Sequence, residues 1–499
     1  MNLIDRILEH ACSRPRALAL RGNGIDLDYL GLVVELYRLA LKLRKLRINT
    51  LGLDMDNGPI WVLFDLAAAS MGITLVPIPP FFSNQQVQHC LQQAGVQAVI
   101  SDNPELFKSR AVDAVANSWD QLSVMQQNVA LINAFGDGAS VPSEVAKVTF
   151  TSGTTGEPKG VMLPWERIEA VVESLASAVD VRKGDRHLAL MPLSVLLENI
   201  AGLYVTLWTG ATAVLPSLAE TGLKGAAGLD ATAMLGAVQS SNATSVILTP
   251  QTLQGLVETI EQGSAQPEQL RFIAVGGASV STQLLARARR VNLPVFEGYG
   301  LSECASVTTL NTASKYKVGS VGRPLPHSKI RIADDGEVLV SGNLFAGYLG
   351  ADAPQLENGW WHTGDIGYLD EDGFLYLSGR RRNIFITAYG RNVSPEWVER
   401  ELVLEKPIIQ AAVFGEAKPW NVAVIVAMPG TAAGDLAASI ARVNSTLPDY
   451  ARVTRWIIAD EPFTPVNRQL SGTGRIRRQA IYQTYQQQIE SLYQEELVS

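Results

Sequence analysis

Between about residues 185 and 300, short apolar runs alternate with longer segments in which apolar residues recur at helical spacing. The apolar runs are HLALMPL, TAVLPSL, SVILTP, RFIAVGG and PVFEGYG, and the clearest helical segments are QTLQGLVETIEQ and STQLLARARRV. This alternation predicts parallel sheet covered by helices. Ligands of such sheets bind beyond the carboxyl ends of the strands. The segments VGGAS (275–279) and GYGLSE (298–303), which follow the last two runs, are therefore candidate site segments.

After about residue 330 the pattern changes to a meander of short strands. KIRIAD, EVLVSG, FLYLSG and NIFITAYG are separated by Asp-Asp-Gly and Glu-Asp-Gly turns. Ser394 followed by Pro395 predicts a helix start, because a hydroxyl cap and a proline at the first helical position favour one. Two further strands and a glutamine-rich helix follow. The segment GRRRN (379–383) is the candidate boundary between these two sequence patterns, so we predict domains at 1–379 and 380–499.

Composition narrows the class of protein. With 499 residues, 47% hydrophobic and 18% charged, the chain predicts a globular protein of two or more domains. A net charge of −8 argues against a nucleic-acid partner. The most apolar stretch, WVLFDLAAASMGITLVPIPPFF, contains Asp65 and predicts a buried helix running into a strand, with no transmembrane segment. The three cysteines lack metal-ligand spacing, the five scattered histidines are expected to be surface or capping residues, and we expect a cytoplasmic protein.

The segment TFTSGTTGEPKG, residues 149–160, is unusually rich in glycine and threonine. Free backbone amides and hydroxyl groups can converge on an anion where glycines permit close approach, and Lys159 adds a positive charge. These features predict a polyphosphate site, although the P-loop spacing is not matched. The alternative is a solvated surface loop.

This loop is followed in order by EGYGLSECAS (297–306), WHTGDIG (361–367) and GRRRN. With these motifs over nearly its whole length, the chain resembles the adenylate-forming superfamily of acyl- and aryl-CoA synthetases, nearest to the fatty and long-chain acyl-CoA ligases. The resemblance implies an α/β fold class. It comprises a large N-terminal domain of helix-covered, mostly parallel sheets with a small β-barrel-like portion, and a smaller, mobile α+β C-terminal domain.

The resemblance also implies roles for the motif residues. Lys159 would clamp ATP phosphates together with the loop, Glu303 would ligate Mg²⁺, and Asp365 would accept the ribose hydroxyls. Tyr299 would stack on adenine and Arg380 would assist at the ribose; the alternatives are a core aromatic, a turn residue at Asp365 and a solvated arginine. The implied ATP/AMP-binding residues are Thr151, Ser152, Gly153, Thr154, Thr155, Gly156, Gly276, Gly277, Ala278, Gly298, Tyr299, Gly300, Ser302, Asp365 and Arg380.

Three positions depart from the pattern of the superfamily. Arg475 stands where its members carry a lysine that serves the carboxylate and the α-phosphate; arginine keeps the charge but is longer and planar. Val195 occupies the place of a histidine common in long-chain relatives, and we assign it, with Gly202, to the acyl pocket. Arg382 stands at the implied hinge between the domains, where aspartate or lysine is common.

We therefore predict an AMP-forming acid–thiol ligase with Arg475, Lys159 and Glu303 as catalytic residues. It would convert a carboxylic acid, fatty or aromatic, to acyl-AMP with release of pyrophosphate, and then to a coenzyme A thioester; its cofactors would be ATP, Mg²⁺ and coenzyme A. Alternatives are loading of an acyl carrier protein, closure of a β-lactone, or a non-catalytic nucleotide- or acyl-binding protein.

Overall fold

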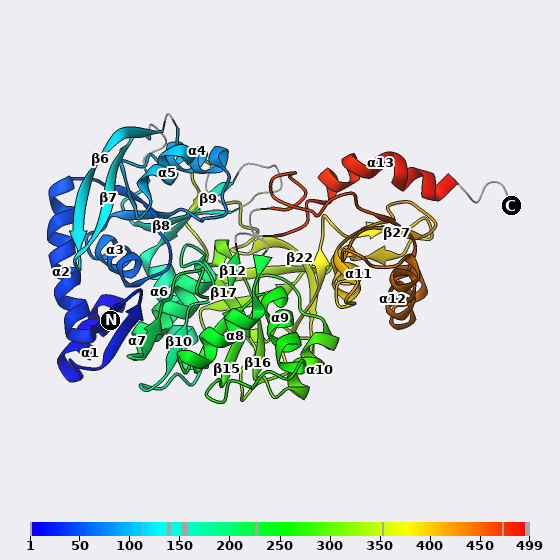
Figure 1. The fold of residues 1–499 in the computed structure, drawn as a ribbon, viewed down its shortest axis with the longest axis horizontal. Helices are drawn as coiled ribbons and strands as arrows, with labels where there is room; N and C mark the ends of the chain where they lie inside the picture. Colours follow the sequence, from blue (N-terminus) through cyan, green and yellow to red (C-terminus); the bar gives the residue numbers. More distant parts are fainter. Residues whose placement is uncertain are drawn as a thin grey trace.

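The structure is a computed structural model that describes residues 2–112, 114–136, 141–151, 158–224, 228–351, 354–471 and 474–494. Figure 1 shows a large N-terminal domain and, beside it, a smaller C-terminal domain that carries α11, α12 and α13. The α/β fold class predicted from the alternating pattern is confirmed. In the described ranges no helix is long and apolar enough to cross a membrane.

The first large sheet has the strand order β21-β9-β8-β4-β3-β5-β7-β6. Its centre is parallel, because β4 and β5 flank β3 and β8 runs with β4. The strands in chain order are β3 (Thr50–Asp54), β4 (Thr74–Pro77), β5 (Ala98–Ser101), β6 (Val115–Val124), β7 (Gln127–Ala134), β8 (Val145–Thr151), β9 (Lys159–Pro164) and β21 (Gly347–Tyr348). The accompanying helices are α1 (Leu3–Ser13), α2 (Tyr29–Leu46), α3 (Pro59–Ser70), α4 (Asn84–Gln93) and α5 (Pro104–Arg110).

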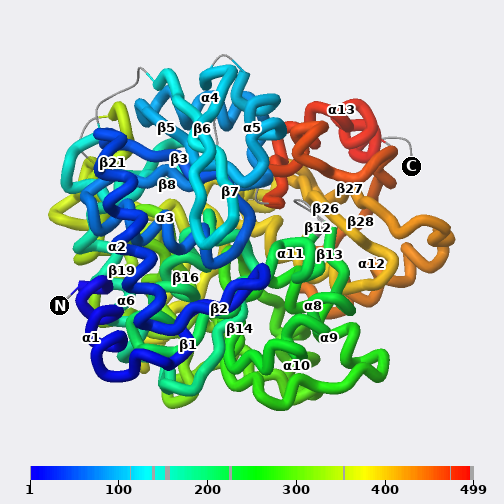
Figure 2. The backbone as a smooth tube through the Cα atoms, turned by 60° about the vertical axis from the view of Figure 1, so that its left-hand side comes forward, coloured from blue at the N-terminus to red at the C-terminus, as the bar shows by residue number. Residues whose placement is uncertain are grey.

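The second large sheet has the order β18-β17-β16-β15-β14-β10-β11-β1-β2. Its strands are β1 (Leu18–Gly22), β2 (Ile25–Asp28), β10 (Arg186–Leu188), β11 (Thr212–Val214), β14 (Ser245–Leu248), β15 (Phe272–Val275), β16 (Val295–Leu301), β17 (Ser306–Leu310) and β18 (Arg323–Pro324). One face packs against α8 (Ala231–Ser240), α9 (Pro250–Glu261) and α10 (Thr282–Arg290) through a shared apolar core. Figure 2 shows these three helices gathered at one flank.

The opposite face of this sheet packs against three helical segments. They are α6 (Trp165–Ala178), the π-helix η1 (Leu197–Tyr204) and α7 (Val205–Thr209), which continues η1. A π-helix is rare and is found mostly at functional sites, where its wider turn places side chains that a regular helix would not. A short hairpin of β12 (Leu223–Lys224) and β13 (Gly228–Leu229) precedes α8.

The remaining sheets belong to the second half of the chain. Three of the four predicted meander strands form an antiparallel sheet of order β19-β20-β22-β23, with β19 (Ser328–Ile332), β20 (Glu337–Gly342), β22 (Trp361–Leu369) and β23 (Leu375–Arg380). The prediction misses β22 and is wrong for NIFITAYG, which contributes only the short strand Phe385–Ile386 of a separate hairpin. The hairpin β24 (Phe385–Ile386) and β25 (Asn392–Val393) leads to α11 (Pro395–Leu402). The smaller domain is completed by β26 (Ile408–Phe414), β27 (Asn421–Ala427), α12 (Ala433–Thr446), β28 (Val453–Ile458) and α13 (Arg478–Gln494).

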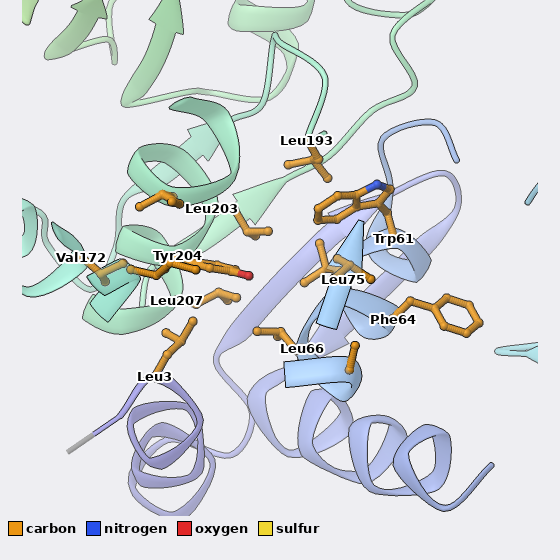
Figure 3. Close-up of a cluster of buried hydrophobic side chains, with 14 of the residues drawn as sticks. Leu3, Trp61, Phe64, Leu66, Leu75, Val172, Leu193, Leu203, Tyr204 and Leu207 are labelled. Carbon is orange, nitrogen blue, oxygen red and sulfur yellow. The ribbon is translucent and has the colours of Figure 1, made fainter. Parts of the chain in front are cut away.

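A buried ion pair explains why an aspartate stands in the most apolar helix. Lys147 of β8 lies 2.9 Å from the Asp65 carboxylate of α3, and both are almost inaccessible. The Tyr204 hydroxyl donates to Asp65 Oδ2 at 2.6 Å, and Asn199 also bonds both charged groups. Figure 3 shows Tyr204 among buried leucines between the helices of η1 and α3. A buried pair is tolerated only when its remaining donors and acceptors are satisfied, as they are here.

Candidate active site

One large cleft of about 1820 Å³ lies at the carboxyl ends of β14, β15 and β16 and is closed on one side by the smaller domain. Its lining includes the loop residues beyond these strands, the ends of β22 and β23, and the segment around residue 475. Parallel strands place their carboxyl ends at one edge, so segments separated in sequence meet there. The smaller domain reaches this edge through the segment between β28 and α13.

Asp365 is the centre of a polar cluster in this cleft. It lies opposite Arg380 in the β22–β23 ladder. The Arg380 Nε lies 2.7 Å from Asp365 Oδ1, and the Tyr299 hydroxyl donates to Oδ2 at 2.6 Å. Burial raises the pKa of the Asp365 carboxyl, while Arg380 and the Tyr299 hydrogen bond act in the opposite direction. The carboxylate is therefore held in one orientation by donors on both oxygens.

Glu303 and Lys159 both line the cleft, and both contact the same aromatic residue, Tyr348. The Tyr348 hydroxyl donates to Glu303 Oε1 at 2.7 Å, and the Lys159 ammonium lies 5.1 Å from the centre of the Tyr348 ring. This contact fixes Oε1 of Glu303; among the described residues, Oε2 has no hydrogen-bond partner. Burial, followed by the neighbouring Glu303 carboxylate, raises the pKa of Tyr348, so that its hydroxyl stays a donor.

Arg475 enters the cleft from the smaller domain. Its Nη2 donates to the carbonyl oxygen of Gly277, 3.1 Å away, in the VGGAS segment beyond β15. The side chain is open to the solvent of the cleft, yet protein surrounds it closely. Desolvation and the positive charges of Arg380 and Arg382 lower the pKa of its guanidinium. The negative charges of Asp365 and Glu303 oppose this shift without cancelling it.

Most of the predicted site residues that the structure describes line this single cleft. They are Thr151, Lys159, Val195, Gly276, Gly277, Ala278, Gly298, Tyr299, Gly300, Ser302, Glu303, Asp365, Arg380, Arg382 and Arg475. Gly202 lies behind the wall, against His187 and Glu198. The predicted loop residues Ser152, Gly153, Thr154, Thr155 and Gly156 lie outside the described residues.

Sequence reasoning missed two participants in the cleft. Tyr348 stands in no motif that we singled out, and its contact with Glu303 joins positions 45 apart. The expectation that the histidines are surface or capping residues is wrong for His10 and His187, which are buried. His187 lies on β10 and lines the cleft, where it contacts Glu198 and Ser245. The alternation HLAL contained the signal, because His187 must face opposite to Leu188.

Comparison with known proteins gives the family. The model of the AMP-binding enzyme family matches residues 8–361, and that of the AMP-binding enzyme C-terminal domain matches residues 382–497. The chain belongs to the AMP-binding enzyme family. Among curated relatives of this AMP-binding enzyme, the long-chain-fatty-acid–CoA ligase FadD15 of Mycobacterium bovis is 27% identical, over 87% of this chain and 86% of the relative. The 2-succinylbenzoate–CoA ligase of Bacillus mycoides is 30% identical, over 75% of this chain and 77% of the relative.

Solved structures show the same fold. The O-succinylbenzoate coenzyme A synthetase MenE of Bacillus subtilis in complex with AMP superposes with a TM-score of 0.76 at 23% identity, over 95% of this chain and 97% of MenE. The anthranilate CoA ligase AuaEII in complex with anthranoyl-AMP gives a TM-score of 0.80 at 17% identity, over 97% of each chain. The resemblance stated from the motifs, including the class of acid–CoA ligases, is thereby confirmed.

Proposed function

We propose that this AMP-binding enzyme activates a carboxylic acid with ATP to give acyl-AMP and pyrophosphate, and then transfers the acyl group to coenzyme A. The observation that carries the proposal is the convergence of Lys159, Glu303, Asp365 and Arg475 from two domains on one cleft. The relatives named above are CoA ligases, which supports the same assignment.

The cluster around Asp365 suits a nucleotide. Asp365 would accept the ribose hydroxyls, with Arg380 holding its other oxygen, and Tyr299 would lie along the base. Gly276, Gly277 and Ala278 form the open edge at which the base and the acyl group would meet. A side chain at Gly277 would be strained, because its φ is +83°. In this orientation the triphosphate would extend toward Lys159 and Glu303.

The charge that develops in the reaction determines the role of the cations. Attack of a carboxylate oxygen on the α-phosphorus brings two anions together, and preorganised cations at that point lower the barrier. Arg475 would serve the carboxylate and the α-phosphate, while Lys159 would serve the departing pyrophosphate. The attacking oxygen becomes part of the acyl-phosphate bond, and the bond to the β-phosphate bridging oxygen breaks.

The residues present suit Mg²⁺. Among the described residues, Oε2 of Glu303 has no hydrogen-bond partner, and no group of three or more His, Cys, Asp or Glu side chains forms a complete metal cage. Mg²⁺ is usually bound by one or two carboxylates together with substrate phosphates, so Glu303 alone is a sufficient protein ligand. When bound, the ion would neutralise charge on the phosphates. MenE of Bacillus subtilis has been solved with ATP and a magnesium ion.

The smaller domain, 380–499, would move between the two half-reactions. Arg475 reaches Gly277 only from this domain, so the described pose suits adenylation. Rotation about Arg382 would withdraw Arg475 and bring the segment 388–395 to the cleft for the thiol, a motion that often limits turnover.

The proposal is tested by exchange of labelled pyrophosphate into ATP with a panel of fatty and aromatic acids. We expect exchange with at least one acid and thioester formation when coenzyme A is added. ATP binding without exchange by any acid would contradict the proposal and favour a binding protein. Exchange without a coenzyme A thioester would instead indicate a carrier protein or lactone closure.

A further inference from the structure

The lining of the cleft continues past Gly276 along the second large sheet and the helical segments η1 and α7, and we call this part of the cleft the tunnel. Its sheet wall is made by Ser245 and Ile247 of β14 and by Phe272 and Ala274 of β15. Alternate residues of these strands face away and pack against α8, α9 and α10. Small residues at 274 and 276 leave room along the wall. From Gly276 to Phe272 the tunnel follows four strand steps, or ~13 Å.

The helical wall of the tunnel is apolar. Leu197, Ala201 and Val205 recur every four residues along η1 and the start of α7, and each lines the cavity. Leu197 also lies opposite Gly276, at 3.5 Å from the position that a β-carbon there would occupy. The walls suit an aliphatic chain that extends from the cleft toward the amino ends of the strands.

Toward the amino ends of the strands the lining becomes polar; it includes His187 and Ser245 and, beyond them, the paired Asp185 and Arg271. His187 Nδ1 lies 3.1 Å from Ser245 Oγ, and His187 Nε2 lies 2.7 Å from Glu198 Oε1. His187 and Ser245 line the cavity, whereas Glu198 is fully inaccessible. Gly202 makes room for this arrangement, because a β-carbon there would lie only 2.3 Å from Glu198 Oε1 and 2.4 Å from His187 Nε2.

The hydrogen bonds determine what Ser245 can offer to a ligand. Glu198 Oε2 accepts from the backbone N–H of Met191 at 3.1 Å, so the Glu198 carboxylate acts as an acceptor. His187 then donates through Nε2 and accepts at Nδ1. In this tautomer, which we assign from the contacts of the two ring nitrogens, the Ser245 hydroxyl would donate to Nδ1, and its oxygen would be available to accept a hydrogen bond in the tunnel.

We propose that Ser245, oriented by His187 and Glu198, accepts a hydrogen bond from a hydroxyl group at the far end of the acyl chain. The acid would be an aliphatic hydroxy acid whose hydroxyl is remote from the carboxylate. This inference rests on the proposed function. Ser245 is the residue that touches the substrate; His187 and Glu198 are positioning residues.

The experiment compares matched acids in pyrophosphate exchange by the full-length protein. Decanoic, dodecanoic and tetradecanoic acids are each compared with their ω-hydroxy and ω-methoxy counterparts. A site built to bond a hydroxyl rejects the analogue that lacks it. We expect the ω-hydroxy acid of fitting length to have about ten-fold higher kcat/KM than the plain acid, mainly through KM. The ω-methoxy acid, which accepts but cannot donate, should show no such gain.

In the variant Ser245→Ala the ω-hydroxy acid and the plain acid should have equal kcat/KM, because the group that distinguishes them is gone. Ser240→Ala, an exposed serine of α8, is the matched control and should alter neither. Equal rates with plain and hydroxy acids at every length, or a hydroxyl preference that survives Ser245→Ala, would overturn the inference. Exchange with aromatic acids alone would also overturn this inference, while leaving the proposed function intact. Failure to exchange with any acid would contradict both this inference and the proposed function.

Discussion

The Arg475 guanidinium donates to the carbonyl oxygen of Gly277, and this hydrogen bond joins positions 198 apart in the sequence. It connects the segment before α13, in the smaller domain, to the loop beyond β15, in the large domain. The cation thus lies in the cleft where we propose that the reaction occurs, although the resemblance implies a lysine at this position.

Replacing Arg475 tests this placement. Arg475→Ala should lower the rate of adenylation by about 100-fold, the usual effect of losing one preorganised donor at a developing charge. Arg475→Lys should keep or raise the rate, because the charge remains. Single-turnover formation of acyl-AMP measures the step. Arg477→Ala, a nearby arginine that does not line the cleft, should leave the rate unchanged. An unaltered rate in Arg475→Ala would remove this residue from the mechanism.

Asp365→Ala should weaken ATP binding. Two hydrogen bonds from the ribose to a charged group are lost, but one of them only replaces the bond from Tyr299. The net loss is therefore that of one bond, about 1.5–3 kcal/mol, so we expect an increase in Kd of at least about ten-fold. Calorimetric titration with ATP measures it. The exposed Asp372, which lies in the turn after β22, provides the control Asp372→Ala. Equal ATP affinity of the Asp365 variant and the native protein would contradict the ribose role.

Lys147→Ala should destabilise the large domain. The change leaves Asp65 charged and buried without its cation, and breaking a buried pair in this way costs about 3–5 kcal/mol. The free energy of unfolding in urea measures the loss. Lys183→Ala, at an exposed lysine, should stay within about 0.5 kcal/mol of the native protein. A loss as small as that of Lys183→Ala would show that the pair is dispensable.

Glu297 should contribute to the pH dependence of stability. Burial raises the pKa of this carboxyl from 4.5 to about 7, although Gly319 and Arg400 act in the opposite direction. The folded state therefore binds more protons than the unfolded one between these values, so the contribution of Glu297 to stability falls as pH rises from about 4.5 to 7.

Glu297→Gln removes this titration. Relative to the native protein, the variant should gain stability as pH rises through that window, by up to about 3 kcal/mol. Scanning calorimetry at intervals from about pH 4 to 8 gives the difference between the two proteins. Glu416→Gln, at an exposed glutamate, should show a constant difference. A flat difference for Glu297→Gln as well would mean that the pKa of this carboxyl is the same in the folded and unfolded states.

Much of the framework follows from local patterns. The stretch WVLFDLAAASMGITLVPIPPFF forms α3 and β4 as predicted, because its length, apolarity and Gly72 determine a buried helix followed by a turn. The alternating segments between 185 and 300 form parallel strands with covering helices. The loops beyond these strands share one edge for the same reason, so several site residues could be placed near one another from the sequence.

Contacts between distant elements could not be predicted in this way. The pairing of Asp65 with Lys147 depends on how α3 crosses β8, and nothing near either residue encodes it. The π-helix η1 contains Asn199 and Tyr204, both bonded to that pair, and no local pattern in its sequence predicts these contacts. Arg475 reaches Gly277 only because two domains meet.

The hydrogen bond from Tyr299 to Asp365 has a consequence for the energetics of nucleotide capture. A phenol already occupies one carboxylate oxygen, so an incoming sugar would exchange one donor for another and would not have to strip water from a bare anion. The affinities for a ribose and a deoxyribose should consequently differ little at this contact, since the Tyr299 hydroxyl can again donate to the carboxylate oxygen that the deoxy sugar leaves unbonded.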